Sequence, residues 1–330
     1  KAFGYGSDAA EVAKFLKNDV DFFAVAYTDE GINLRNAGIE NPILVLHPQI
    51  QNLELIIKHQ LEPSLYNFKI FTAFLALADS KVLLNYPIHI KFNTGLNRIG
   101  FWHTDIPKII SELKETNHIK VASIFSHLAA SEDLNENAFT LNQIESFKTI
   151  ATQFTKQIGY SPLQHICNTS GILNYPEAQF DMVRSGIGLY GFGNSKTENT
   201  HLTPIATLKS VLSQIHHIEK GETVGYNMAF TSNAPKKTAT VPIGHADGIG
   251  RQYGNGNGFI IVNGEKAPII GNVCMDMIMV DITTIECEEG DEVIIFGTHL
   301  TAEDLAATSN TISYELLTAI SQRIKRVIRR

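Results

Sequence analysis

Basic side chains in this 330-residue sequence recur directly after short apolar runs. Lys91, His127, His165 and Arg184 each stand at or just past the end of such a run. A lysine amine in this position can form a Schiff base with a carbonyl group, and guanidinium groups bind carboxylates and phosphates. Glycines follow Arg184, and they let backbone N–H groups approach a phosphate closely. The complete set of polar residues at these run ends comprises Lys1, Tyr5, Thr28, Asp29, His47, Lys91, Arg98, His127, His165, Asn168, Thr169, Arg184 and Gly186.

The residue types in this set exclude several kinds of chemistry. The set holds no pair of spaced carboxylates of the kind that glycoside hydrolysis needs. The sequence contains no His, Cys or Asp cluster with metal-ligand spacing and no Gly-x-Ser-x-Gly nucleophile motif. We therefore expect an enzyme without a metal ion that uses a phosphorylated cofactor or substrate.

The apolar runs alternate with amphipathic helical patterns over the first two-thirds of the chain. Buried parallel strands are continuous apolar runs, and each is joined to the next by a crossover helix. Counting a strand that would end at Lys1, the pattern gives eight strand positions and favours a closed (β/α)8 TIM-like barrel, which carries its active site at the C-terminal strand ends. The predicted strands are 22–27, 42–47, 68–71, 88–92, 121–126, 163–167 and 180–184, and the predicted helices include 9–16, 52–59, 106–113 and 137–156.

The pattern changes after about residue 202, where strand-like stretches follow one another without long helices. Such a pattern is typical of a separate, mainly β domain. We therefore predict a barrel domain of residues 1–202, with its first strand upstream of Lys1, and a mainly β domain of residues 203–330. The predicted strands are 206–215, 238–243, 259–262, 267–279 and 292–296, followed by short helices at 302–308 and 314–321.

The composition excludes nucleic acid and membranes as binding partners. With 27 basic and 34 acidic residues the formal net charge is −7, so the chain has no basic field for nucleic acid or an anionic membrane. The longest apolar run is far shorter than the roughly 18 residues that a membrane-spanning helix needs. The three cysteines form no Cys-x-x-Cys pair, which is typical of a reducing compartment, and we expect a cytoplasmic protein.

Nine short motifs, in order along both predicted domains, resemble the alanine racemase family, whose members combine a barrel with a β domain. The motifs are Lys1-Ala-Phe-Gly-Tyr5-Gly, Lys91-Phe-Asn-Thr-Gly-Leu-Asn-Arg98, Ser126-His127-Leu-Ala, His165-Ile-Cys-Asn168-Thr169, Met182-Val-Arg184-Ser-Gly186-Ile187, Val224-Gly-Tyr226, Pro242-Ile-Gly-His245, Val273-Cys274-Met275-Asp276 and Ile312-Ser-Tyr314-Glu.

The resemblance implies a two-base racemisation of alanine on pyridoxal 5'-phosphate, which supplies D-alanine for peptidoglycan. By resemblance, Lys1 forms the aldimine and is the base on the D face of the substrate, and Tyr226 is the base on the L face. His127 and Arg184 are then expected to be cationic neighbours that favour the Tyr226 phenolate. Arg184 would donate to the pyridine nitrogen, with His165 orienting it. The other implied cofactor-binding residues are Tyr5, His127, Asn168, Thr169, Gly186, Ile187 and Tyr314.

Other residues would bind the amino-acid substrate. The planar fork of Arg98 suits the substrate carboxylate. Lys91 would repel Arg98 unless it is carbamylated, as in some members of the family, or a chloride ion lies between them; both alternatives stay open. Cys274 and Met275 are expected at the substrate pocket. The resemblance also implies a homodimer in which each active site combines the barrel of one subunit with the β domain of its partner.

Four positions depart from the commoner family pattern, and they leave the substrate breadth open. Asn93, Thr169, His245 and Asn272 stand where Asp, Ser, Tyr and Arg are more usual. A serine or broad-specificity racemase of the same family therefore remains an alternative. A barrel decarboxylase that uses the same cofactor, or a non-catalytic carrier of it, would leave the Tyr226 motif or the β domain unexplained.

A Schiff-base lysine at a strand end needs the strand that precedes it. We therefore expect the natural polypeptide to continue upstream of Lys1, and fusion to a further domain is one form that this continuation would take.

Overall fold

The structure, a computed structural model, describes residues 1–329. The chain forms two compact units. The barrel unit comprises Lys1–Gly4, Ala9–Leu189 and Gly193–Leu202, and the β unit comprises Tyr5–Asp8, Tyr190–Phe192 and the residues from Thr203 onward. The family-typical Lys-to-Tyr motif at the start of the chain is thus divided between the two units.

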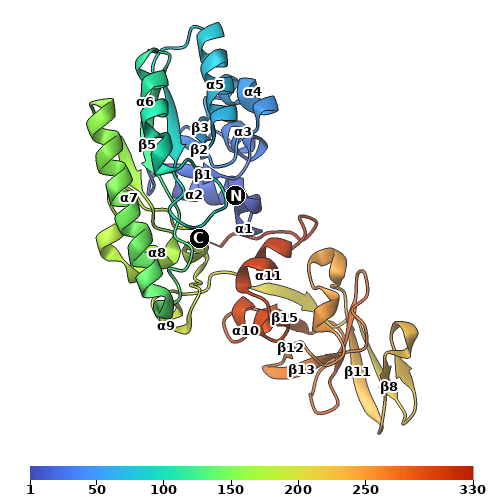
Figure 1. Cartoon of the computed structure of the whole chain (residues 1–330). Coiled ribbons are helices and arrows are strands. Elements are labelled where there is room, and N and C mark those ends of the chain that lie inside the picture. The colour runs from blue at the N-terminus through green and yellow to red at the C-terminus, as the bar shows by residue number, and fades with distance from the viewer. Residues whose placement is uncertain (330) are drawn as a thin grey trace. The chain divides into compact units, whose positions relative to one another are not determined.

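The barrel unit is built on a curled sheet of six parallel strands that pair in chain order (Figure 1). Its strands are short, and most of their residues are buried. They are β1 (Phe23–Val25), β2 (Ile43–Val45), β3 (Glu62–Leu65), β4 (Tyr86–Lys91), β5 (Ile119–Phe125) and β6 (Leu163–His165).

A helix follows every strand of this sheet and covers its outer face. In α6, for example, Ile106, Ile109, Ile110 and Leu113 recur at three- and four-residue spacing and are all buried, so burial of one apolar stripe stabilises the helix against the sheet. The six helices are α3 (Thr28–Asn36), α4 (Leu53–Lys58), α5 (Phe68–Ser80), α6 (Ile106–Lys114), α7 (Asn137–Ile158) and α8 (Thr169–Asn174). Three further short helices, α1 (Ala2–Tyr5), α2 (Ala9–Leu16) and α9 (Lys196–Asn199), lie outside this strand–helix alternation.

The expected fold class, a barrel-like parallel α/β unit followed by a mainly β unit, is confirmed. One strand prediction, 68–71, is wrong: these residues begin α5. The side chain of Asn67 accepts a hydrogen bond from the Ile70 amide at 3.0 Å and caps the helix. The apolar pattern then continues to Ala78, too far for one strand. The strand before this helix is β3. Its first residues, Glu62 and Pro63, break the apolar pattern that would mark a buried strand in the sequence.

The predicted strand 180–184 is not a regular strand in the described chain. The segment does run beside β6, because the amides of Asp181 and Arg184 donate to the carbonyls of Gln164 and Cys167 at 3.1 Å. Phe180 has a left-handed backbone (φ 47°), which interrupts the ladder. The segment still carries Arg184 to the C-terminal end of β6.

The β unit contains an antiparallel sheet of seven strands in the order β7-β15-β12-β13-β14-β11-β8 and a two-stranded ribbon, β9–β10. Its elements are β7 (Leu208–Val211), β8 (Gln214–Ile218), β9 (Thr223–Val224), β10 (Phe230–Thr231), β11 (Lys236–Val241), β12 (Phe259–Val262), β13 (Glu265–Ile270), β14 (Ile278–Asp281), β15 (Glu292–Phe296), α10 (Ala302–Ala307) and α11 (Ser313–Ala319).

Two long strand predictions in this unit are each divided in the structure. The stretch 206–215 forms β7 and the start of β8, which occupy opposite ends of the sheet order. The stretch 267–279 forms β13 and the start of β14, and the chain leaves the sheet at Gly271, whose φ of 64° favours glycine. The loop between β13 and β14 therefore carries Asn272, Cys274 and Met275.

None of the helices in residues 1–329 is both long enough and apolar enough to cross a bilayer.

Candidate active site

Arg184 lies among the polar groups at the C-terminal ends of β5 and β6. Its guanidinium donates to the carbonyls of Ser126 and Ile166 at 2.9 and 3.0 Å. It also bonds to Nδ1 of His127 at 3.1 Å and to Nδ1 of His165. Burial lowers the pKa of Arg184 to about 10, so the group keeps its charge at neutral pH. The structure thus brings Arg184, His127 and His165 into one network.

Both histidines of this network are neutral at physiological pH. Burial and the charge of Arg184 hold the pKa of His127 well below its usual range, and Lys91 and Arg98 lower it further. Burial, Arg184 and His89 do the same for the pKa of His165. The expectation that His127 is a cationic neighbour is therefore wrong, because an imidazolium would face a guanidinium in a poorly solvated place.

The ring of Phe125 packs beside this network. It stacks on the His165 ring with 4.8 Å between centroids and 3° between planes. The Arg184 guanidinium lies 5.4 Å and the Lys91 amine 5.6 Å from its centroid. The ring quadrupole attracts both cations without supplying a proton acceptor.

Lys91 is 6% exposed, and its pKa falls to about 8 because of burial and the charges of Arg98 and Arg184. Arg98 follows on a tight loop that the Phe92–Phe101 bridge closes. The Asn93 side chain shapes this loop by accepting hydrogen bonds from the amides of Gly95 and Asn97 at 3.1 and 3.0 Å. An aspartate would accept the same two bonds, so the departure at Asn93 preserves the loop.

Lys1 belongs to the same barrel unit. Burial, the charge of Arg98 and, to a smaller extent, the charge of Arg184 lower the pKa of its ε-amine. The Glu30 carboxylate raises this pKa but does not outweigh them. The Glu30 carboxylate accepts hydrogen bonds from the amides of Ala2 and Ala26 and so fastens the chain next to Lys1 to the start of α3. An amine with a lowered pKa reacts more readily with a carbonyl group, which fits an aldehyde cofactor.

Hydroxyl and backbone N–H groups gather beyond β6. The Thr169 hydroxyl accepts from the amides of Gly186 and Gly188, each at 3.2 Å. A Cβ on Gly188 would lie 2.7 Å from the Thr169 methyl group, so only glycine permits this approach. The Asn168 side chain caps α8 through the Gly171 amide at 2.9 Å. Together, Thr169, Gly186 and the adjacent Ile187 form a set of neutral donors that fits a phosphate group.

In the β unit, three loops bring the remaining candidates together. The Asn272 side chain donates to the Tyr226 carbonyl at 3.1 Å. The amide of His245 donates to the Cys274 carbonyl at 3.0 Å, and that of Ala246 to Met275. The side chains of Tyr226 and Met275 project into solvent, with exposed fractions of 74% and 60%.

Tyr5 and Tyr314 also lie in the β unit, where they form an aromatic cluster with Tyr190. The ring of Tyr5 lies 5.1 Å from Tyr190 and 6.0 Å from Tyr314, measured between centroids. Burial raises the pKa of Tyr5 and raises that of Tyr190 to about 12. The phenols of Tyr5 and Tyr190 therefore stay protonated at neutral pH, so each can donate a hydrogen bond.

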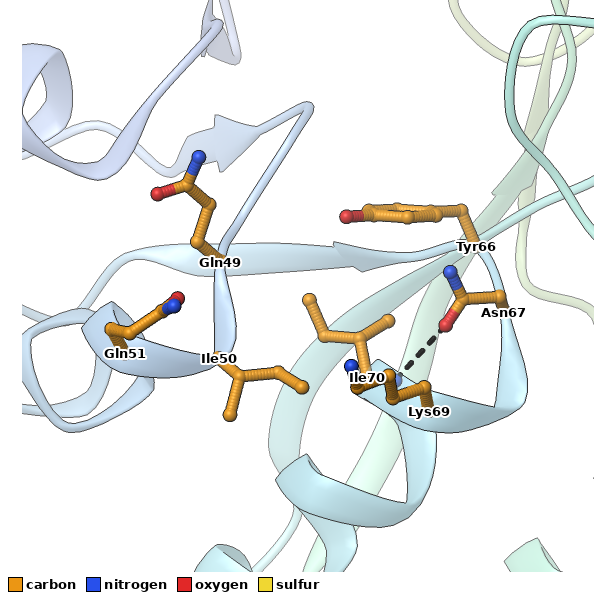
Figure 2. Close-up of a pocket in the computed structure, with 7 residues that line it drawn as sticks. All are labelled: Gln49, Ile50, Gln51, Tyr66, Asn67, Lys69 and Ile70. Atoms are coloured by element: carbon orange, nitrogen blue, oxygen red, sulfur yellow. Dashed lines mark hydrogen bonds between the residues drawn. The ribbon is translucent and has the colours of Figure 1, made fainter.

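A surface pocket of about 310 Å³ in the barrel unit contains none of these candidates. It lies between the segments after β2 and β3, where Figure 2 shows Asn67 bonded to the first turn of α5. Its only charged lining residue is Lys69. The candidate residues around Arg184 therefore lie outside this pocket.

Sequence reasoning missed several polar residues that support the candidates. Glu30 lies in a helix and Glu62, His89 and Ser123 lie in strands, and no local motif marks any of them. The available signal is a polar residue in the middle of a buried apolar run, such as His89, because a buried polar group needs a partner.

The fold and the site define a class of protein: a barrel enzyme that has a lysine of lowered pKa, a guanidinium held by neutral groups and a set of neutral donors that fits a phosphate. The family model for the alanine racemase N-terminal domain matches residues 1–193, and that for the C-terminal domain matches residues 205–328. The chain belongs to the alanine racemase family.

Relatives and solved structures agree with the family models. The chain is 36% identical to the alanine racemase of Thermodesulfovibrio yellowstonii, over 99% of this chain and 87% of the relative. It is also 36% identical to that of Carboxydothermus hydrogenoformans, over 99% and 90%. The structure of alanine racemase from Clostridium difficile 630 matches with a TM-score of 0.90 at 34% identity, over 98% of this chain and 85% of that one. The Bacillus anthracis enzyme with bound L-Ala-P matches with the same TM-score and coverage at 28% identity.

The neutral state of His127 predicts a pH dependence of stability. Below pH 6.5 the unfolded chain protonates this histidine before the folded chain does, so the free energy of unfolding falls as the pH falls. Between pH 7 and 5 this histidine accounts for a loss of about 2 kcal/mol. In urea titrations, the loss in His127→Asn is expected to be smaller by that amount. His216→Asn, which removes an exposed ring on β8, should match the parent; equal losses in all three proteins would contradict the assignment.

Proposed function

We propose the following division of roles in the racemisation of alanine, the reaction of this family. The barrel residues hold pyridoxal 5'-phosphate and one catalytic base, and the β unit supplies the second base. The observation that carries the proposal is the pairing of a Lys1 amine of lowered pKa with an Arg184 guanidinium that only neutral groups hold.

Lys1 anchors the cofactor covalently, and Thr169, Gly186 and Ile187 bind its phosphate, with Tyr5 and Tyr314 as further donors. Neutral N–H and O–H donors bind a phosphate without placing another cation near Lys1, which keeps the Lys1 amine easily deprotonated. Asn168 supports the phosphate-binding residues indirectly. Its side chain already caps α8 and accepts a hydrogen bond from the Ser131 hydroxyl at 2.8 Å.

When bound, the cofactor delocalises the negative charge left on the substrate Cα after a proton is removed. Lys1 moves the proton on the D face, which its lowered pKa supports, and Tyr226 moves the proton on the L face. Arg184 donates a hydrogen bond to the pyridine nitrogen. Because a guanidinium with a pKa of about 10 keeps its proton at neutral pH, Arg184 would hold that nitrogen as a hydrogen-bond donor without transferring a proton to it.

Arg98 binds the substrate carboxylate with its planar fork. Its charge also acts on Lys91, whose pKa of about 8 leaves about a tenth of the amine unprotonated at pH 7. An unprotonated Lys91 avoids repulsion with Arg98. It is also the form that a carbamylation would modify, whereas a chloride ion would bind beside the protonated form.

We further propose a homodimer with two shared active sites. The support is that the β unit exposes four large apolar side chains on neighbouring loops: Tyr226, Met228, Met275 and Met277. Exposed apolar clusters of this kind mark protein–protein interfaces. A two-fold interface would apply the same surface at both sites. Cys274, on the same loop as Met275, would then line the substrate pocket with it.

The product, D-alanine, would serve peptidoglycan synthesis. The three cysteines at positions 167, 274 and 287 are all unpaired thiols in the structure, which supports a reducing compartment such as the cytoplasm.

Borohydride reduction of the cofactor-loaded protein should fix the cofactor on Lys1, because Lys1 is the more accessible of the two low-pKa lysines in the barrel. Peptide mass mapping identifies the labelled residue. A label on Lys91 instead would contradict the role of Lys1, and a protein that takes up no pyridoxal phosphate at all would contradict the proposed function.

Mixing two inactive variants tests the shared site. Lys1→Ala and Tyr226→Phe each remove one base, and a mixed dimer of the two contains one intact site and one doubly defective site. Random subunit exchange makes half of the dimers mixed, so activity should return to about a quarter of the parent value. If both bases came from one chain, every site would keep a defect, and zero recovery after demonstrated exchange would exclude the shared site.

A further inference from the structure

A continuous line of hydrogen bonds leads from Arg184 through the interior of the barrel. His165 Nε2 bonds to the Ser123 hydroxyl at 2.9 Å, and that hydroxyl bonds to His89 Nδ1 at 2.6 Å. His89 Nε2 then bonds to the Glu62 carboxylate at 2.8 Å. His165, Ser123 and His89 are fully buried, and 13% of the Glu62 side chain is exposed.

The strand register explains why these side chains form a line. They come from the neighbouring strands β3, β4, β5 and β6, and His89 is paired directly with Ser123. His165 is paired with Phe125, two residues beyond Ser123 on the same face. The interior of such a barrel is usually filled with branched apolar side chains. A buried polar line is costly compared with apolar packing, so these four residues need a reason to be there.

The two ends of the line fix the direction of every hydrogen bond in it. A guanidinium has only donors and an ionised carboxylate has only acceptors. Arg184 therefore donates to His165 Nδ1, and the neutral His165 ring carries its proton on Nε2 and donates to Ser123. Ser123 then donates to His89 Nδ1, and His89 donates from Nε2 to Glu62. With a single ring proton on His89, reversal of the Ser123–His89 link would leave His89 Nε2 and the Glu62 carboxylate as two facing acceptors.

A guanidinium, that of Arg35, lies near the Glu62 end of the line. Burial lowers the pKa of the neighbouring Arg35, and the Glu62 carboxylate opposes that lowering. At the other end of the line, Arg184 makes no ion pair within residues 1–329, and its four hydrogen bonds all go to neutral acceptors. The line of hydrogen bonds therefore connects the guanidinium of Arg184 to the carboxylate of Glu62.

We infer that Glu62, His89 and Ser123 are positioning residues that lock His165 in its Nε2–H form, so that Nδ1 always accepts from Arg184 and the guanidinium keeps one orientation toward the cofactor. This inference rests on the proposed role of Arg184 at the pyridine nitrogen. The line does not deliver protons to the reaction, because it ends at a guanidinium that does not release one. None of the three residues touches the substrate or the cofactor.

The chain offers a matched control for breaking the line. Ser123→Ala removes the hydroxyl that joins the two imidazoles. Ser64→Ala removes a second buried hydroxyl, on β3, which is paired in register with His89 but has no hydrogen-bond partner among residues 1–329. Both variants delete the same atom from the barrel interior, so only the role of the line separates them.

The first measurement reads the histidine rings directly, in the full chain labelled with ¹⁵N-histidine, with and without the cofactor. Long-range ¹H–¹⁵N spectra distinguish protonated from unprotonated ring nitrogens, and His89→Gln and His165→Asn assign the signals. The parent and Ser64→Ala should show both rings only in the Nε2–H form. In Ser123→Ala the His165 ring loses its partner at Nε2, so the guanidinium should turn away in part and the Nδ1–H form of His165 should also be populated. A parent protein with His165 protonated on Nδ1, or on both nitrogens, would overturn the inference.

The second measurement is the steady-state racemisation of L-alanine. Ser123→Ala should lower kcat by about tenfold or more, as expected for a buried donor left without its acceptor, with KM changed less than about twofold. Ser64→Ala should keep kcat within about twofold of the parent. Equal kcat values in the two serine variants would overturn the positioning role. A loaded parent that does not racemise alanine would instead overturn the proposed function and leave the tautomer result standing.

A second pair of variants covers the case in which Ser123→Ala does not fold. Glu62→Gln keeps the shape of the side chain but can present either a donor or an acceptor to His89, so mixed tautomers are expected at His89 and His165. Asp79→Asn is its control, because Asp79 pairs with His118 at 3.1 Å outside the line. A single Nε2–H tautomer retained at both rings in Glu62→Gln would contradict the inference.

Discussion

A guanidinium group that is largely removed from water needs an acceptor for each of its N–H groups, and at Arg184 all four acceptors are neutral. Two of them are main-chain carbonyls at the ends of β5 and β6, and two are histidine rings from the same strand ends. Only adjacent parallel strands deliver these groups to one point, since their carboxyl ends meet at one edge of the sheet. The barrel therefore provides the geometry that the charge requires.

The uncompensated charge of Arg184 in turn sets the protonation states around it. It helps to lower the pKa values of His127, Lys91 and Lys1, so the histidine is neutral and both lysines lose their protons more readily than free lysine. Neutral histidines are what allow Arg184 to donate to them. A lysine of lowered pKa is what covalent attachment of an aldehyde and subsequent proton transfer both need. One electrostatic constraint thus serves binding, orientation and acid–base chemistry.

The sequence indicated the strand-end residues well, because each follows an apolar run and lies in a recognisable motif. It misplaced the strand before α5, since β3 contains Glu62 and Pro63 and lacks an apolar pattern. It also missed His89 and Ser123 as functional residues. Their importance depends on pairing across strands that lie far apart in the chain, and local periodicity carries no information about that register. The charge state of His127 could not be predicted from the sequence either. It depends on the burial of the ring and on the nearby charge of Arg184, which only the folded chain brings together.

The central claim is that Arg184 is a fixed hydrogen-bond donor that does not transfer its proton. The most direct test uses pyridoxal phosphate labelled with ¹⁵N in the ring and bound to the protein, with its nitrogen chemical shift compared with those of the protonated and unprotonated free cofactor. The account predicts the shift of an unprotonated, hydrogen-bonded pyridine nitrogen throughout the neutral pH range. The shift of a protonated pyridinium nitrogen would contradict it.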